Sequence, residues 1–93
     1  MRFEWDANKA LINFVKHKIS FREATEVFFD PNALEDYDSF HSTHETRFSL
    51  IGFSTRRLLF VAFTVRSTDT IRLISARKAN QAERQIYERR INR

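Results

Sequence analysis

Positively charged side chains occupy strand positions where apolar β-branched residues would be expected. The segment 72–78 has the pattern of a strand, yet it contains Arg72 and Arg77 and ends in Lys78. A guanidinium group on a sheet face must be paired, solvated or directed at a ligand, because burying it without a partner is costly. Its planar fork can hold two phosphate oxygens at once. The pattern therefore predicts either a phosphate-binding clamp or a set of internal ion pairs.

Three residues elsewhere in the chain could take part in the same chemistry. Arg47 begins an earlier strand that could neighbour this one, and in the ion-pair interpretation its partner is Glu45 or another acid. His17 could carry a proton in the reaction, or it could be a cation at a helix C-terminus. Tyr87 could stack on a base or donate a proton, or it could form part of the core.

Several other kinds of site are disfavoured. The spacing of His41, His44 and Glu45 resembles a metal motif only superficially, because it is not His-Glu-x-x-His and no third ligand is evident. We therefore expect no metal and no cofactor. A single glycine excludes the glycine-rich loops that hold nucleotide phosphates, and the absence of cysteine excludes disulfides and thiolate chemistry.

Length and charge restrict the class of protein. The 93 residues fit a single domain over residues 1–93. Residues 1–55 carry six basic and nine acidic side chains, whereas residues 56–93 carry ten basic and three acidic ones. This asymmetry favours a polyanion-binding face in the C-terminal part, although a solvated charged surface would look the same. No apolar run is long enough to span a membrane and no signal-peptide pattern is present, so we expect a cytoplasmic protein.

The elements that would position these residues begin with a short edge strand over 2–5. Asp6 then caps a helix over 7–16, with Ala7, Ala10, Leu11, Phe14 and Val15 on its apolar stripe. Ser20 and Glu23 form the capping box of a second helix, which ends at Asp30-Pro31.

The rest of the chain has the pattern of strands followed by one helix. Strands are predicted over 32–37, 47–53, 58–65 and 70–78, with turns over 54–57 and 66–69 and a polar loop over 38–43. A final helix starts at Asn80, ends near Asn92, and turns Ala82, Ile86 and Tyr87 inward. The short connections force neighbouring strands to run antiparallel. The predicted class is α+β, with the order β-α-α-β-β-β-β-α.

Short motifs along nearly the whole chain, in this order and spacing, resemble those of the BrnT family of toxins. The motifs are Glu4-Trp5-Asp6 with Lys9, Lys16-His17, Ser20-Phe21-x-Glu23-Ala24, Val27-Phe28-x-Asp30-Pro31, Glu45-x-Arg47, Gly52, and Arg72-x-Ile74-Ser75-Ala76-Arg77-Lys78-Ala79 with Glu83-Arg84 and Tyr87. The loop from Asp38 to His44 matches least.

The resemblance implies a RelE-like fold, in which an N-terminal helical hairpin and a C-terminal helix pack on a twisted antiparallel sheet. It implies an endoribonuclease that inhibits translation and is neutralised by a BrnA-type antitoxin, a ribbon-helix-helix protein. The toxin would bind operator DNA only through its complex with the antitoxin. A toxin homodimer within that complex is compatible with the resemblance. No membrane partner is implied.

Cleavage of RNA without a metal needs attack of the 2′-hydroxyl on the adjacent phosphorus, with a base, an acid and cations that stabilise the phosphorane. On this resemblance, Arg47, Arg72 and Arg77 would stabilise the phosphorane. Proton transfer would fall to His17, Glu45 or Tyr87, and RNA binding to Lys78, Arg56, Arg57 and Arg84.

Two reservations accompany these assignments. Arg72 and Arg77 point to opposite faces of an ideal strand, so one of them is structural unless a bulge turns it. The alternatives to an enzyme are a non-catalytic nucleic-acid-binding domain of the same fold, and an interaction domain whose arginines pair with Asp36, Glu45, Glu83 and Glu88.

Overall fold

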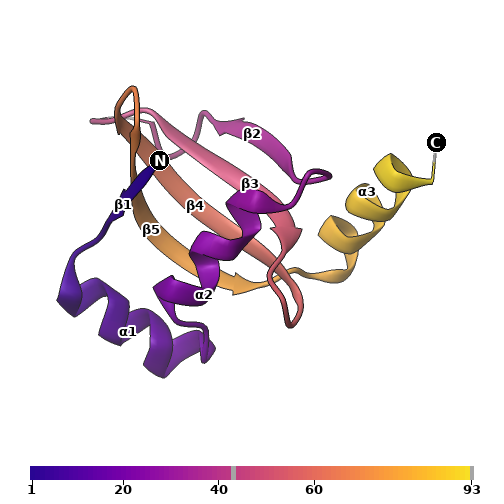
Figure 1. Cartoon of the computed structure of the whole chain (residues 1–93), viewed down its shortest axis with the longest axis horizontal. Coiled ribbons are helices and arrows are strands. Elements are labelled where there is room, and N and C mark those ends of the chain that lie inside the picture. The colour runs from indigo at the N-terminus through magenta and orange to yellow at the C-terminus, as the bar shows by residue number, and fades with distance from the viewer. Residues whose placement is uncertain (43, 93) are drawn as a thin grey trace.

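The computed structural model describes residues 1–42 and 44–92, so Thr43, at the end of the expected polar loop, lies outside the described residues. The order of elements agrees with the prediction, apart from a 3₁₀ helix, η1, that extends the second helix (Figure 1). Their bounds are β1 (Arg2–Glu4), α1 (Ala7–His17), α2 (Phe21–Thr25), η1 (Glu26–Phe29), β2 (Leu34–Asp38), β3 (Arg47–Phe53), β4 (Leu58–Ser67), β5 (Thr70–Lys78) and α3 (Gln81–Ile91).

The five strands form one sheet in the order β1-β5-β4-β3-β2. Strands β2 to β5 are an antiparallel meander, as predicted from their short connections. The edge strand β1 instead runs parallel to β5, with Arg2 opposite Thr70, so the sheet is mixed rather than wholly antiparallel. The chain can return parallel because α1, α2 and three strands separate the two elements. Strand β4 continues to Ser67, which shortens the turn expected over 66–69.

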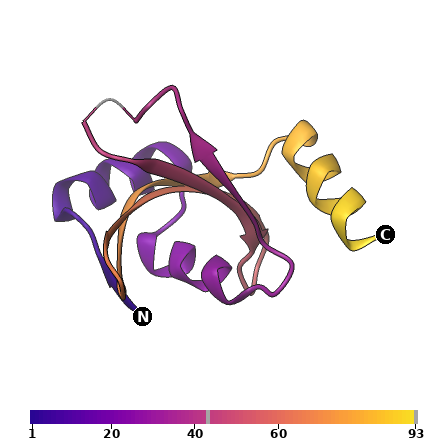
Figure 2. The same ribbon diagram turned by 90° about the horizontal axis from the view of Figure 1, so that it is seen from above.

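Helices α2 and η1 lie inside the curve of the sheet (Figure 2). Their apolar residues pack on the concave face, where the main core includes Phe21, Val27, Val61 and Phe63. Gly52 of β3 makes the close approach possible, because a Cβ there would stand 3.2 Å from the carbonyl oxygen of Val27. A larger side chain would push η1 away from the sheet.

Helix α1 does not bury the stripe that its sequence pattern predicts. Leu11, Phe14 and Val15 are exposed, and the buried residue of the helix is Asn13. The Asn13 amide donates to the carbonyl oxygens of Ile19 and Ala76 and accepts from the Ala76 N–H. It thereby satisfies the edge of β5 beyond the end of β1. The prediction of an inward Leu11–Phe14–Val15 stripe is wrong because this backbone edge needed a polar partner.

Helix α3 stands beyond one end of the sheet (Figure 2). Asn80 and Glu83 form the predicted capping box. Tyr87 is the buried residue of α3 and belongs to a smaller apolar cluster with Ile51 and Leu58. Ala82 and Ile86, expected to face inward, are exposed because the helix touches the sheet along a narrow strip.

The predicted cap of α1 by Asp6 is confirmed. Of the capping box predicted for α2, only the hydrogen bond accepted by Ser20 is present. Asp6 accepts from the Lys9 N–H and Ser20 accepts from the Glu23 N–H. The Glu23 carboxylate does not reach back to Ser20 but bonds Arg57 instead. Among the described residues, no helix is long and apolar enough to cross a membrane.

Candidate nucleic-acid interface

A bulge in β5 determines which way its arginine side chains point. The pairing of β5 with β4 skips Ile74, so β5 has one extra residue there. Beyond a bulge of this kind the alternation of side chains between the two faces reverses. Leu73 and Ala76, although three residues apart, are accordingly buried in the same core. Arg72 and Arg77 therefore share the opposite face, which we call the open face because α2 and η1 lie on the other side.

Cross-strand pairing extends this face into a row of polar side chains. Arg47 lies opposite Thr64, Thr64 lies opposite Arg72, and the row ends at Asp38 on one edge and Glu4 on the other. We call these five residues the arginine row. It places two guanidinium groups from strands far apart in the sequence on one side of one sheet.

Arg47 has a side-chain donor without a hydrogen-bond partner among the described residues. Its Nε atom is buried and has no hydrogen-bond partner among the described residues. The nearest carboxylate oxygen, Glu45 Oε1, is 3.5 Å from Nε, which is an ion-pair contact rather than a hydrogen bond. A buried donor without an acceptor costs about 1–3 kcal/mol. The Arg47 side chain as a whole is 29% exposed, so a phosphate would approach the rest of the guanidinium group rather than Nε.

Glu4 holds the other end of the arginine row. Its Oε2 atom accepts from Arg72 Nη1 at 2.8 Å and lies 3.6 Å from Arg66 Nε. One carboxylate therefore faces two guanidinium groups, which leaves this end of the open face with excess positive charge. Such an excess attracts a polyanion.

Arg77 is held firmly in place. Its two terminal nitrogens donate to the two oxygens of Glu83 at 2.8 and 2.9 Å, and its guanidinium carbon lies 4.3 Å from the centre of the Phe60 ring. Burial alone would raise the pKa of Glu83, but hydrogen bonds from Arg77 and the Asn80 N–H outweigh it and hold that pKa below its usual value. Of the three arginines, Arg77 is the most rigidly oriented by its partners.

His17 lies at the margin of the open face, beside β5. It lines a hollow of about 210 Å³ together with Lys9, Lys16 and Ser75. Ser75 belongs to the open face, because it lies opposite Ala62 in the row next to the arginine row. The hollow thus adds cationic side chains from α1 to the arginines on the sheet.

Tyr87 lies elsewhere. It is 3% exposed, and its hydroxyl donates to Asp30 Oδ2 at 2.6 Å. Burial and the Asp30 carboxylate raise the pKa of Tyr87 to about 12. These contacts make it a structural residue that joins α3 to the end of η1, and we leave it out of the candidate site.

The residues expected to bind RNA are scattered. Arg57 forms a bidentate ion pair with Glu23, whose pKa these hydrogen bonds hold below its usual value. Arg56 is exposed in the same turn. Lys78 lies opposite the core residue Leu59, hence on the helix side of the sheet, and Arg84 is half-buried on α3. The structure does not bring these four together with the arginine row.

The loop histidines are placed apart from the arginines of β5. His41 is exposed, and its Nδ1 atom lies 2.8 Å from Asp38 Oδ2. Within residues 1–42 and 44–92, no group of three or more histidine, aspartate and glutamate side chains is arranged to hold a metal ion.

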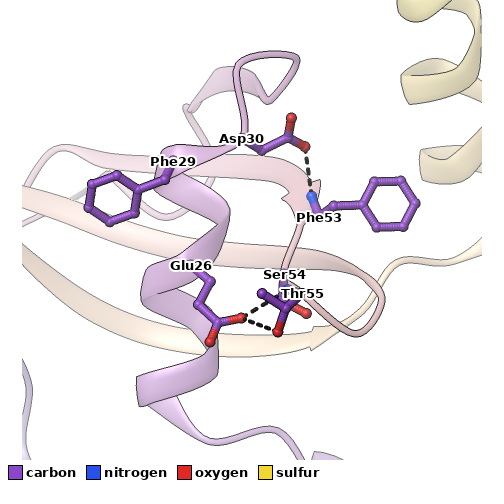
Figure 3. Close-up of a pocket in the computed structure, with 6 residues that line it drawn as sticks. All are labelled: Glu26, Phe29, Asp30, Phe53, Ser54 and Thr55. Atoms are coloured by element: carbon purple, nitrogen blue, oxygen red, sulfur yellow. Dashed lines mark hydrogen bonds between the residues drawn. The ribbon is translucent and has the colours of Figure 1, made fainter.

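A second hollow, of about 410 Å³, lies on the helix side of the sheet between η1 and the β3–β4 turn (Figure 3). Its carboxylates are already engaged, because Glu26 accepts from Thr55 and Asp30 accepts from the Phe53 N–H. These bonds fasten η1 to the turn. We assign the hollow a structural role.

Sequence reasoning missed part of the open face. Glu4 lies on β1, whose parallel pairing with β5 leaves no local signal, and Arg66 lies in a segment that the sequence predicts as a turn. Phe60 and Thr64 sit in a segment that is apolar on both faces, which hides the face they occupy. The sequence allows a bulge in this strand, but no glycine or turn residue marks Ile74 as its position.

The fold and this face together define a class: a small α+β protein with arginine side chains gathered on one face of its sheet. Comparison with known families identifies the family within this class. The family model of the ribonuclease toxin BrnT, of type II toxin–antitoxin systems, matches residues 5–83. The chain therefore belongs to the BrnT family, which is described as ribonuclease toxins. Membership implies an RNA target and a protein antitoxin.

A solved structure supports the fold. The crystal structure of the Brucella abortus ribonuclease toxin BrnT is similar with a TM-score of 0.66 and 24% sequence identity, over 87% of this chain and 99% of that one. No curated protein matches the sequence.

Proposed function

We propose that this protein is a metal-independent endoribonuclease that cleaves RNA on its open face and thereby inhibits translation in the cytoplasm. The observation that carries the proposal is the bulge at Ile74, which gathers Arg72, Arg77 and Arg47 on one side of the sheet. Arg47 and Arg72, in one cross-strand row, can supply without a metal ion the positive charge that a developing phosphorane needs.

In the proposed reaction the 2′-hydroxyl oxygen bonds to the adjacent phosphorus while the bond from phosphorus to the 5′-oxygen breaks. Arg47 and Arg72 bind the non-bridging phosphate oxygens from either side of Thr64 in the arginine row. Arg77, oriented by Glu83 and Phe60, lies four residue steps from the arginine row, roughly 13 Å, and binds another phosphate of the same RNA strand in this proposal. The products are a 2′,3′-cyclic phosphate and a 5′-hydroxyl.

Proton transfer falls to Glu45 and His17 in this proposal. Glu45 lies beside Arg47, where its carboxylate can accept the proton of the 2′-hydroxyl. His17 lies at the opposite margin with Lys9 and Lys16, where a protonated imidazole can donate to the leaving 5′-oxygen. Tyr87 has no part in it, since its hydroxyl is buried against Asp30.

We propose a BrnA-type ribbon-helix-helix antitoxin as the partner, with operator DNA bound through the complex and a toxin homodimer within it. The exposed apolar side chains of α1 support a protein partner. Leu11 is 63% exposed, Ile12 65% and Val15 62%, and such a group of apolar residues is typical of an interface.

The test is to incubate the purified protein with RNA in excess EDTA and to identify the ends of the fragments. We expect cleavage that leaves 2′,3′-cyclic phosphates. Cleavage that EDTA abolishes and a divalent metal restores would contradict metal independence, and intact RNA after long incubation would contradict the enzyme.

The second candidate is a non-catalytic RNA-binding domain, favoured by the carboxylates that already contact the arginines. Glu4 and Glu83 hydrogen-bond Arg72 and Arg77. In that case RNA would bind with strong salt dependence and would be recovered uncut.

A further inference from the structure

A third hollow lies on the open face, between the arginine row and α3. Its volume is about 320 Å³, and its apolar wall is formed by Leu34, Ile51, Phe60 and Ile86 from three strands and one helix. Proteins that recognise single-stranded RNA place its bases against aromatic side chains or the planes of arginine side chains. Phe60, with the Arg77 guanidinium 4.3 Å from its ring centre, offers such a surface.

The hollow is placed correctly for a base next to the scissile phosphate. Ser49, which lines it, is two residues along β3 from Arg47. Two residues of a strand span about 7 Å, which is of the order of the separation between the phosphate and the base of one nucleotide. A phosphate held at Arg47 and Arg72 would therefore have an adjacent base at the hollow.

The rim of the hollow is acidic. Asp36 lines it and is exposed; its Oδ1 atom accepts from the Tyr37 N–H, and no hydrogen bond of the described chain engages Oδ2. Glu83 also lines it, but its oxygens are engaged by Arg77 and the Asn80 N–H. Glu35 lines the hollow too, but it lies opposite the core residue Leu50, so its side chain belongs to the helix side of the sheet. Asp36 is therefore the carboxylate that can accept hydrogen bonds from a bound base.

Resting on the proposed ribonuclease function, we propose that this hollow is a nucleobase subsite that selects guanine beside the scissile bond. Guanine presents an N1–H and an exocyclic amine side by side, which together match the unengaged Oδ2 of Asp36 and the second lone pair of its Oδ1. Uracil presents carbonyl oxygens on both sides of its one N–H, and these repel Asp36. Adenine and cytosine each offer one amine, so we expect them to bind more weakly than guanine and more strongly than uracil.

The first experiment measures cleavage of deoxyoligonucleotides that contain one ribonucleotide, with each of the four bases placed in turn on each side of the scissile bond. On one of the two sides we expect guanine substrates to be cut about tenfold faster than uracil substrates, in line with the discrimination of a bidentate contact. Asp36→Asn should reduce that ratio below about threefold with uracil substrates cut as before. Glu88→Gln, an equal change of charge on exposed α3, should leave the ratio unchanged.

The second experiment separates this inference from the proposed function. Methyl NMR of Ile51 and Ile86 is recorded during titration with guanosine and uridine monophosphates. We expect guanosine monophosphate to shift both methyl signals, and Ile86→Trp, which fills the hollow, to abolish the Ile51 shift while Ile91→Trp does not.

Four outcomes decide the matter. Guanine preference that Asp36→Asn removes supports the subsite. Methyl shifts without any cleavage support it too, while contradicting the enzyme. RNA cleavage at equal rates for all four bases, or a preference indifferent to Asp36→Asn, overturns the subsite and leaves the enzyme standing. Absence of methyl shifts with both nucleotides overturns it as well.

Discussion

At the scale of single residues, Tyr87 and Asp30 show how a candidate catalytic group can serve the fold instead. The Tyr87 hydroxyl donates to Asp30 Oδ2, which also accepts from the Phe53 N–H. Burial alone would raise the pKa of Asp30, but hydrogen bonds from Phe53, Tyr87 and Asn32 hold it below its usual value. The pair therefore links α3, η1 and β3 through one charged acceptor.

Tyr87→Phe should lower stability without affecting cleavage. Loss of one hydrogen bond to a charged acceptor costs about 1.5–3 kcal/mol, measurable by urea unfolding. Tyr37→Phe, on an exposed edge-strand residue, is the matched control and should change neither property. A tenfold loss of RNA cleavage in a folded Tyr87→Phe protein would show that Tyr87 takes part in the reaction and would contradict its structural role.

The ion pair of Glu23 and Arg57 gives a prediction for pH. The pKa of Glu23 is below its ordinary value of 4.5 when the protein is folded, so its contribution to stability is present above that value and is lost as the pH falls through the folded pKa. Glu23→Gln should be less stable at pH 7, by about 2–3 kcal/mol, and its stability should fall less steeply below pH 4.5. Glu88→Gln should follow the wild-type curve in chemical denaturation, and identical curves for all three proteins would contradict this account.

At the scale of elements, Asn13 joins α1 to an edge of β5 that β1 leaves uncovered. Asn13→Leu keeps a similar size but removes all three hydrogen bonds that the amide makes. Because the Ala76 N–H and carbonyl would remain buried, we expect a loss of about 2–4 kcal/mol. Asn8→Leu, exposed on the same helix, is the control. Thermal unfolding of the two variants checks the prediction, and equal midpoints would contradict it.

Helix α1 also carries the exposed apolar group that we assign to the antitoxin. Leu11→Glu combined with Val15→Glu should leave stability within about 0.5 kcal/mol of the wild type, as is usual for surface positions. Binding of the co-expressed antitoxin should weaken at least tenfold, which titration calorimetry can measure. RNA cleavage by the free toxin should not change. An unaltered affinity would place the antitoxin on another surface.

Most helices and strands could be predicted from the sequence, but the arrangement of the candidate site could not. Alternation and caps are local signals, so β3 and β5 and the Asn80 capping box could be read directly. The bulge at Ile74 arises from packing, because Leu73 and Ala76 both gain burial only if the strand shifts by one residue. That shift, invisible in the sequence pattern, decides whether Arg72 and Arg77 can act together.

At the scale of the whole molecule, the sheet separates two kinds of surface. Its concave side holds the main core under α2 and η1, and its open face carries the arginine row with a cationic hollow and an apolar hollow on the same side of that row. The asymmetry of charge along the chain foreshadowed a basic surface but not its place, because Arg47 and the lysines of α1 come from the acidic half of the sequence. Topology, rather than composition, assembles this face.

The account depends on the arginine row, and the cleavage rate of Arg72→Ala in EDTA tests it most directly. We expect a loss of at least about 100-fold, in the range found when one charge-stabilising donor is removed. Arg56→Ala, an equal loss of charge in an exposed turn of the helix side, should retain the wild-type rate. The two melting temperatures should agree with that of the wild type within a few degrees. An Arg72→Ala protein that folds and cleaves RNA as fast as Arg56→Ala would contradict the proposal that the open face is the active site.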